Sequence, residues 1–340
     1  MRLITLFLCL GGAVLAQAPR IAVLDFYGLH KTSEAAVRQA RGAKETDPLP
    51  PSKGDAEERI DGISGVVESH LEAVWDAGKT ILYVGLEERG APHFELREAP
   101  EGDMKLPEIM TTEYRHFIES SAAASRANIT AAKSIGEDLT QGHARSADPA
   151  TRAIQDRFPL FATDHLAELR DVLRNSSDEE QRATAAYIIG YGPNKLDVVN
   201  DLQYALRDAD AGVRANATRS LIAIEVLSKL DPKLGIKISP TWFIAMLNSL
   251  SWSDRNRAVA ALQVLTEKAD QGVLDQIREG ALQSLVEMAR WKTLAHALPP
   301  YLLLGRIAGL PEEEVKAAWI RGDRESVIAR ATASAGKKKK

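Results

Sequence analysis

The sequence predicts two parts: an α+β domain with the element order β-α-α-β-β, followed by an all-α superhelical stack of helix pairs. Short runs of β-branched and aromatic residues, bounded by glycine, occur between residues 19 and 98. From residue 164 to residue 330, apolar residues recur instead with helical spacing. In that second region a pattern of arginine, alanine and a branched apolar residue returns, which is typical of helical repeats.

The composition is that of a globular protein and argues against a nucleic-acid partner. The chain has 340 residues, of which 45% are hydrophobic and 26% charged. Its 43 Lys and Arg against 47 Asp and Glu give a net charge of −4, which is too acidic for a dedicated nucleic-acid binder. A chain with a single cysteine, Cys9, cannot build an internal disulfide framework.

The first sixteen residues have the pattern of a secretory signal peptide. Arg2 gives a basic start, residues 3–15 form an apolar run, and Ala16 offers a small residue for cleavage. An uncleaved anchor is the alternative. Cleavage after Ala16 removes Cys9, which suits an oxidising compartment. We therefore expect an exported protein, periplasmic or alternatively secreted, with no membrane span in the mature chain because no later run is long and apolar enough.

The elements of the first domain follow from local patterns. Ser33 is a suitable N-cap for a helix, and Asp76-Ala77-Gly78 is suited to a hairpin turn. The predicted elements, in order, are a strand at 20–27, helices at 34–41 and 55–60, and strands at 66–74 and 80–88. We expect the two helices to cover one face of a small sheet.

Several of these residues together resemble a POTRA (polypeptide-transport-associated) domain. The matching pieces are Gly28-Leu29 after the first strand, the helix starting at Ser33, the turn at Asp47, the helix 55–63, Gly65-Val66-Val67, and residues 84–89. The sequence departs from the family where an aromatic residue usually follows the Gly65 position, and where Lys44-Glu45-Thr46-Asp47 replaces Lys-Pro-Gly-Asp. The resemblance implies binding to other polypeptides, often at an exposed strand edge. The alternative is an unrelated α+β module without such a partner.

Residues 99–163 are expected to connect the two parts. Pro107 opens a helix that carries Tyr114 and Phe117 and then becomes poor in bulky residues, so we expect a spacer or a partly mobile helix. Residues 140–149 are rich in turn formers and predict a linker. A further helix is expected to start near Pro149.

The repeated pattern places three residues of each unit on one side of a helix. The offsets are 0, +3 and +7, and the arginines are 32 and 43 residues apart. The three sets are Arg182, Ala185 and Ile189; Arg214, Ala217 and Leu221; and Arg257, Ala260 and Val264.

The best-formed unit is similar to the HEAT-repeat consensus, on the residues Asp208, Val213, Arg214, Ala217 and Leu221. This resemblance implies a HEAT-like solenoid over residues 164–330, with Asp and Arg side chains hydrogen-bonded between adjacent repeats. Asn175 and Ser176 stand near the Asp position in the unit of Arg182, and Ser251 in the unit of Arg257, so an incomplete ladder is expected. An irregular helical bundle is the alternative. Residues 331–340 predict a disordered basic tail, which could alternatively contact anionic lipid.

No motif in the sequence indicates chemistry. The histidines are scattered, and no nucleophile elbow, P-loop or dinucleotide fingerprint occurs. We therefore predict no catalytic, cofactor-binding or metal-binding residue, and a non-enzymatic scaffold that binds other proteins of the cell envelope. The alternative is an enzyme or small-ligand-binding protein with its site on the concave face of the repeats or between the domains. A deep pocket with converging polar groups would favour the enzyme, and an open groove would favour binding.

Overall fold

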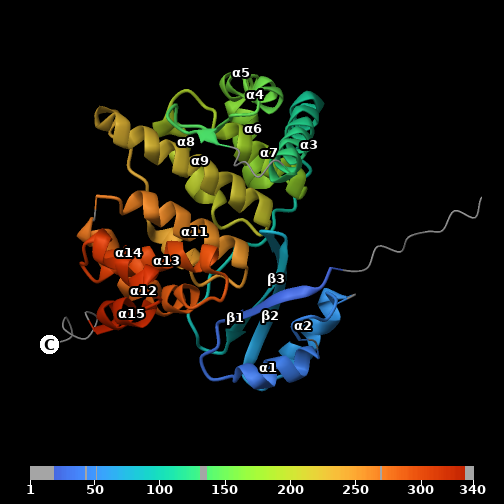
Figure 1. Ribbon diagram of the computed structural model, residues 1–340. Coiled ribbons are helices and arrows are strands. Elements are labelled where there is room, and N and C mark those ends of the chain that lie inside the picture. The colour runs from blue at the N-terminus through green and yellow to red at the C-terminus, as the bar shows by residue number, and fades with distance from the viewer. Residues whose placement is uncertain (1–18, 43, 51, 131–135, 269, 334–340) are drawn as a thin grey trace, which may run out of the picture.

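The computed structural model describes residues 19–42, 44–50, 52–130, 136–268 and 270–333 (Figure 1). The predicted signal peptide, including Cys9 and Ala16, and residues 334–340 of the predicted tail lie outside the described residues. A small N-terminal sheet region followed by a helical body is confirmed.

The sheet region has the predicted β-α-α-β-β order. Its elements are β1 (Ile21–Tyr27), α1 (Glu34–Arg41), α2 (Lys53–Asp61), β2 (Val66–Asp76) and β3 (Lys79–Glu88). The strand order is β1-β3-β2, with β1 parallel and β2 antiparallel to the central β3. Ser33 caps α1 as expected, and α2 starts earlier than expected because the Ser52 side chain accepts from the Asp55 amide.

The sheet lies between two helical layers, so both of its faces are buried. On one face, Leu24, Leu82 and Val84 pack with residues of α1 and α2. On the other face, Tyr27 and Tyr83 belong to the core of the helical body. The central strand β3 is consequently buried along nearly its whole length, as a strand covered on both faces must be.

The helical body follows the sheet along the chain and contains thirteen α-helices among the described residues. They are α3 (Glu108–Thr130), α4 (Pro149–Gln155), α5 (Phe158–Asp164), α6 (Leu166–Asn175), α7 (Glu179–Ile189), α8 (Lys195–Ala205), α9 (Ala211–Leu230), α10 (Thr241–Met246), α11 (Trp252–Leu265), α12 (Gln271–Ala289), α13 (Leu294–Ile307), α14 (Glu312–Ile320) and α15 (Arg324–Ala333). A two-stranded hairpin, β4 (Glu137–Asp138) and β5 (Arg145–Ser146), and the 3₁₀ turn η1 (Pro232–Leu234) complete it. No described helix contains a stretch apolar enough to cross a bilayer.

Five helices of the body pack side by side in chain order: α7, α9, α11, α13 and α15. Each contacts the next member of this odd-helix row and also the helix that precedes it in the chain. The helices that precede them, α6, α8, α10, α12 and α14, complete five consecutive pairs.

An extended segment, 89–106, connects the sheet to the body and runs backward along it. The Arg97 amide donates to the Arg207 carbonyl in the turn between α8 and α9, at 2.7 Å. Farther along, the Ser177 amide donates to the Gly102 carbonyl at the turn between α6 and α7, again at 2.7 Å. The segment thus ties turns of successive helix pairs together before the chain enters α3.

Helix α3 packs more firmly than its composition predicts. The Tyr114 and Phe117 rings lie 5.2 and 4.7 Å from the Tyr187 ring of α7, centroid to centroid, and both side chains are buried. Because the aromatic residues share one side of the first turns, they anchor α3 even though small residues follow. The expectation of a spacer is wrong for this half of the helix.

The segment 140–149 is also packed, contrary to the expected linker. The Tyr191 hydroxyl donates to the Ala144 carbonyl at 2.8 Å. The Gln155 side chain donates to the same carbonyl and accepts from the Ser146 amide. Buried side chains from α4 and from the residues after α7 thus satisfy the backbone of a segment that has few apolar residues of its own.

Candidate functional site: a groove along α9, α11 and α13

Two of the predicted repeat arginines bridge neighbouring helix pairs. Arg182 of α7 makes a bidentate pair with Asp208, through Nε at 3.0 Å and Nη2 at 2.9 Å. It also donates to the Ser176 carbonyl of its own turn, six residues earlier. Both charged side chains are almost fully buried, at 2% and 4% exposure.

Arg214 of α9 repeats this arrangement one pair further on. It donates to the Asp208 carbonyl of its own turn at 2.8 Å, and its Nε donates to Asp254 of α11. Ser249 occupies the place of Asp208 in the next turn, and its hydroxyl donates to Asp254 at 2.9 Å. The carboxylate that pairs with Arg214 therefore belongs to the first residues of α11 and not to the turn before it. The bridge between the two helix pairs is still formed. The apolar positions Ala185, Ile189, Val213, Ala217 and Leu221 are all buried.

In the third unit, the arginine that makes the equivalent contact lies two residues before the predicted one. Arg255, not Arg257, donates to the carbonyl six residues earlier, that of Ser249, at 2.6 Å. Its companions at +3 and +7, Ala258 and Leu262, are fully buried. Both sets have the same spacing, so the pattern alone cannot choose between them. The rotation of α11 that buries Leu262 places the predicted set, Arg257, Ala260 and Val264, on the open side of the helix.

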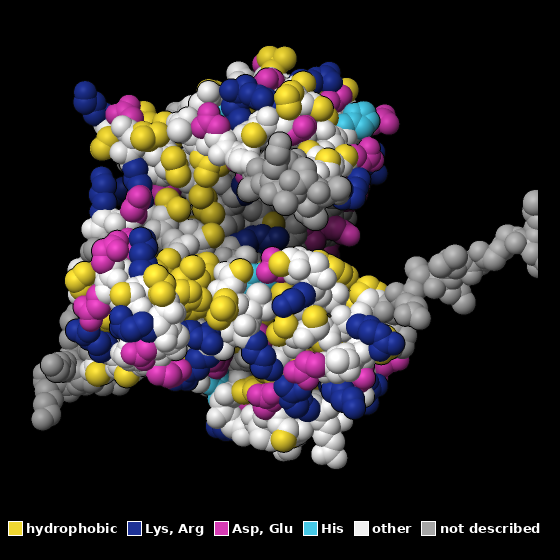
Figure 2. All heavy atoms as spheres, in the orientation of Figure 1, with side chains coloured by type: hydrophobic (Ala, Val, Ile, Leu, Met, Phe, Trp, Pro, Cys, Tyr) yellow, Lys and Arg dark blue, Asp and Glu magenta, His cyan; other side chains and the backbone are white. Residues whose placement is uncertain are grey.

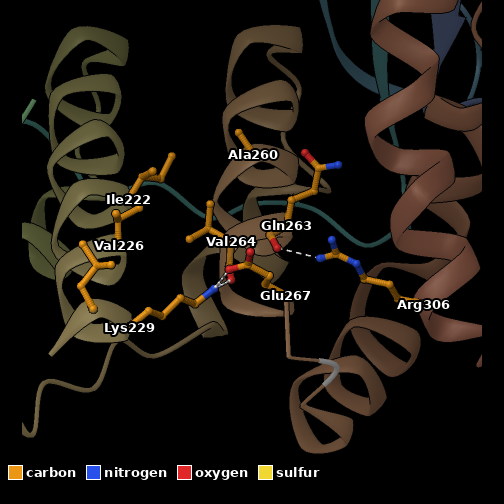
Figure 3. A pocket seen from close by; sticks show the side chains of 9 residues that line it. Ile222, Val226, Lys229, Ala260, Gln263, Val264, Glu267 and Arg306 are labelled. Atoms are coloured by element: carbon orange, nitrogen blue, oxygen red, sulfur yellow. Dashed lines mark hydrogen bonds and ion pairs between the residues drawn. The ribbon is translucent and has the colours of Figure 1, made fainter. Parts of the chain in front are cut away.

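A groove lies on this open side, between α9, α11 and α13 (Figure 3). On α9 its floor is formed by Ile222, Val226 and Leu230, which follow one another at intervals of one helical turn. Ala260 and Val264 of α11 face them. The cavity has a volume of about 690 Å³, and Leu230 is 63% exposed at its edge.

The polar side chains at the far end of the groove are paired with one another. Lys229 of α9 donates to Glu267 at 2.8 Å and also to the Val264 carbonyl. The Lys229 ammonium lowers the pKa of Glu267 through this hydrogen bond. Arg306 of α13 donates to the Gln263 carbonyl at 2.7 Å. These polar groups are bonded to one another across the three helices. Their hydrogen bonds therefore do not point together into the cavity (Figure 3).

The near end of the groove continues into a second cavity of about 310 Å³ that shares Ile222 with the first. Arg219 of α9 lines it and pairs with Glu137 of β4. Arg257 lines it from α11 and makes neither a hydrogen bond nor an ion pair with any described residue. Burial lowers the pKa of Arg257, with Asp254 partly opposing the effect.

The groove combines an apolar floor with charged side chains at its ends. None of the described side chains lining the two cavities is Ser, Cys or His. In the described ranges, no group of three or more His, Cys, Asp or Glu residues is placed to hold a metal ion. An apolar floor with a polar rim, open to solvent, is suited to binding an extended surface.

The predicted positions therefore divide into two classes, and the floor of the groove was not predicted. Arg182, Arg214 and Asp208 form bridges inside the body, whereas Arg257, Ala260 and Val264 line the groove. The missed signal is a second apolar stripe on α9, since Ile222 and Val226 lie beside the buried stripe that contains Leu221. A helix with apolar residues on two sides has more than one surface to cover.

The chain was also compared with known proteins. No protein-family model matches it, and it has no match among curated proteins.

Proposed function

We propose that this protein is an exported, non-enzymatic scaffold of the cell envelope that binds other proteins along the groove between α9, α11 and α13. The observation that carries the proposal is the open apolar floor, which spans two neighbouring helices of the odd-helix row. A small ligand is usually enclosed by its pocket, whereas an open groove with an apolar floor can take the side chains of an extended polypeptide.

Two further features support the fold assigned to this scaffold. The odd-helix row and the bridges from Arg182 and Arg214 support a HEAT-like solenoid, which exposes an extended binding surface. The β-α-α-β-β order supports a POTRA-like N-terminal domain. Export, with the periplasm as the expected compartment, rests on the apolar run 3–15 and the small residue Ala16.

A strand edge of the N-terminal domain is a second contact in this proposal. Asp76 and Lys79 flank a two-residue turn, so they form a hydrogen-bonded pair, and such pairs alternate along the two strands. The amides of β2 that point away from β3 are therefore those of Leu71, Ala73 and Trp75. Glu57 accepts from the Leu71 amide at 2.6 Å. Within the described ranges the amides of Ala73 and Trp75 have no partner, and the Trp75 side chain is 62% exposed.

The opposite edge of the sheet is partly occupied by other segments of the chain. The Lys292 ammonium donates to the Leu24 carbonyl of β1 at 2.6 Å. The Ile21 amide donates to the Asp47 carbonyl at 2.9 Å. The residues Ala73–Trp75 therefore form the edge at which we expect β-augmentation.

The test places a photo-crosslinking amino acid at Val226 in the full-length protein, expressed in its own cells. The matched control carries the same amino acid at Leu196 on α8, which is 53% exposed and outside the groove. We expect polypeptide crosslinks from position 226 that disappear when Val264→Asp is added, and a pattern at position 196 that this substitution does not change.

Crosslinks at position 226 that match those at position 196, or that survive Val264→Asp, would contradict a protein-binding groove. A small molecule retained by the native protein and displaced by Val226→Asp would instead support the alternative of a ligand-binding protein.

A further inference from the structure

We infer that the groove selects a polypeptide segment with an acidic side chain next to apolar ones, and that Arg257 and Arg219 bind the carboxylate. This inference rests on the proposed function and adds the chemistry of the partner.

Arg257 is a cation without a counter-ion in the described structure. Its Nη1 atom is buried and has no hydrogen-bond partner. Two carboxylates act on Arg257 electrostatically, but each is hydrogen-bonded to other donors: Asp254 to Arg214 and a serine hydroxyl, and Glu72 to Ser251 and Ser253. An unpaired, partly buried guanidinium is unfavourable by itself, and a carboxylate from outside would relieve that cost.

Arg219 lines the same cavity, and its position is fixed by an ion pair and by two aromatic rings. Its Nη2 pairs with Glu137, and its guanidinium lies 5.9 Å from the ring centres of Phe117 and Tyr187. The Nε atom is buried and lacks a partner. Arg219 and Arg257 thus line one 310 Å³ space from two neighbouring helices.

The charges around the groove favour an acidic occupant over a basic one. The described side chains lining both cavities include four cations, Lys229, Arg306, Arg219 and Arg257, and two anions, Glu137 and Glu267. This local excess of positive charge contrasts with the net charge of −4 of the chain. Charge complementarity sets which partner is accepted and which is rejected.

The length of the floor favours a peptide segment over a small anion. Ile222 is shared by the two cavities, so the cationic end is continuous with the apolar stripe. At about 1.5 Å of rise per residue, Arg219 and Leu230 are about 16 Å apart along α9. An extended peptide covers this distance with about five residues, at about 3.3 Å each.

The test uses three pools of fluorescein-labelled five-residue peptides and measures fluorescence polarisation. Each pool contains Leu and Val together with one variable residue: Asp or Glu, Asn or Gln, or Lys. We expect the acidic pool to bind about ten- to a hundredfold more tightly than the amide pool, the range for a charged hydrogen bond. Arg257→Gln removes this preference, whereas Arg321→Gln, an exposed control outside the groove, leaves it unchanged.

The outcomes separate this inference from the proposed function. Equal binding of the acidic and amide pools, or an acidic preference that survives Arg257→Gln, would overturn the inference alone. Crosslinks at Val226 together with no binding of any pool would also overturn it. Absence of both pool binding and groove-dependent crosslinks would overturn the proposed function as well.

Discussion

Three arginines of the helical body have similar surroundings, and a fourth has different ones. Arg182, Arg214 and Arg255 each donate to a carbonyl six residues earlier and face a carboxylate of another helix or turn. Arg257 has neither kind of partner among the described residues. The first three therefore connect neighbouring parts of the body, whereas the fourth makes no such bond within the described part of the chain.

A pair of matched substitutions tests this division. Arg214→Met leaves the buried Asp254 carboxylate without its main counter-ion, so we expect the free energy of unfolding to fall by about 3–5 kcal/mol. Arg257→Met removes no observed bond and relieves a partly buried, unpaired guanidinium, so we expect no loss of stability and a gain of up to about 1 kcal/mol. Urea unfolding of both variants measures the difference. A similar loss in the two variants would contradict the assignment.

His143 predicts a pH dependence at the residue scale. Its ring lies 4.8 Å from that of Tyr191, and burial, with repulsion from Lys195 and Arg145, lowers its pKa to about 4. In the unfolded chain the pKa is about 6.5. The unfolded state therefore binds the proton first, and stability is lost as the pH falls from about 6.5 toward 4.

The measurement compares the wild type with His143→Gln, which cannot titrate in this range. We expect the free energy of unfolding of the wild type, relative to that of the variant, to be constant above pH 7 and to decline below about pH 6.5. A difference that stays constant from pH 7 to pH 4 would show that His143 has the same pKa in both states.

At the scale of single elements, the turn between β2 and β3 departs from ideal composition. Ala77 and Gly78 both have positive φ, 47° and 75°. Both central residues of a type I′ turn need this conformation, which an alanine adopts only at a cost. Ala77 is exposed, so the cost lies in its backbone alone.

Replacing Ala77 with Asn creates the Asn-Gly pair that this turn favours. We expect Ala77→Asn to stabilise the protein by about 0.5–1 kcal/mol, which thermal unfolding would show as a higher midpoint. Ala77→Val is the matched control and is expected to destabilise, because a β-branched residue tolerates positive φ least. A lower midpoint for Ala77→Asn would contradict the turn type.

Helices α9 and α3 show how much one element reveals on its own. The buried stripe of α9 that contains Leu221 follows from the spacing of its apolar residues. Whether the side of α9 that carries Ile222 is covered or open depends on the position of the neighbouring helix α11. Tyr114 and Phe117 predict that α3 has an apolar side. They do not predict its partner Tyr187, which lies about seventy residues away in the chain.

At the scale of the whole molecule, the sheet and the helical body share one aromatic core. The Tyr83 ring of β3 lies 5.1 Å from Trp252 and 4.9 Å from Trp291, and its hydroxyl is 2.7 Å from Nδ1 of His296. Tyr27 donates to the Leu250 carbonyl in the same region. The sheet and the helical body are therefore packed against each other as one unit. They are not two separate domains joined only by a linker.

This shared core predicts coupled unfolding. Trp291→Ala removes a fully buried side chain at the junction, and we expect a loss of about 3–5 kcal/mol in the free energy of unfolding. Amide hydrogen exchange should show that β3 and α11 lose protection together. The matched control is Trp75→Ala at the exposed edge, which should change neither region. Full protection of β3 in the Trp291 variant would contradict the coupling.

The sequence by itself determined the order of the five N-terminal elements and most of their ends, because capping residues, turn residues and apolar spacing act within one segment. It also determined which residues of α7 and α9 carry the bridging arginines. Only the tertiary structure decided that Arg255 rather than Arg257 is buried, that residues 140–149 are packed, and that the second face of the sheet is covered. The physical reason is that the rotation of a helix and the covering of a face depend on segments far away in the chain, whose contacts leave no mark on local spacing.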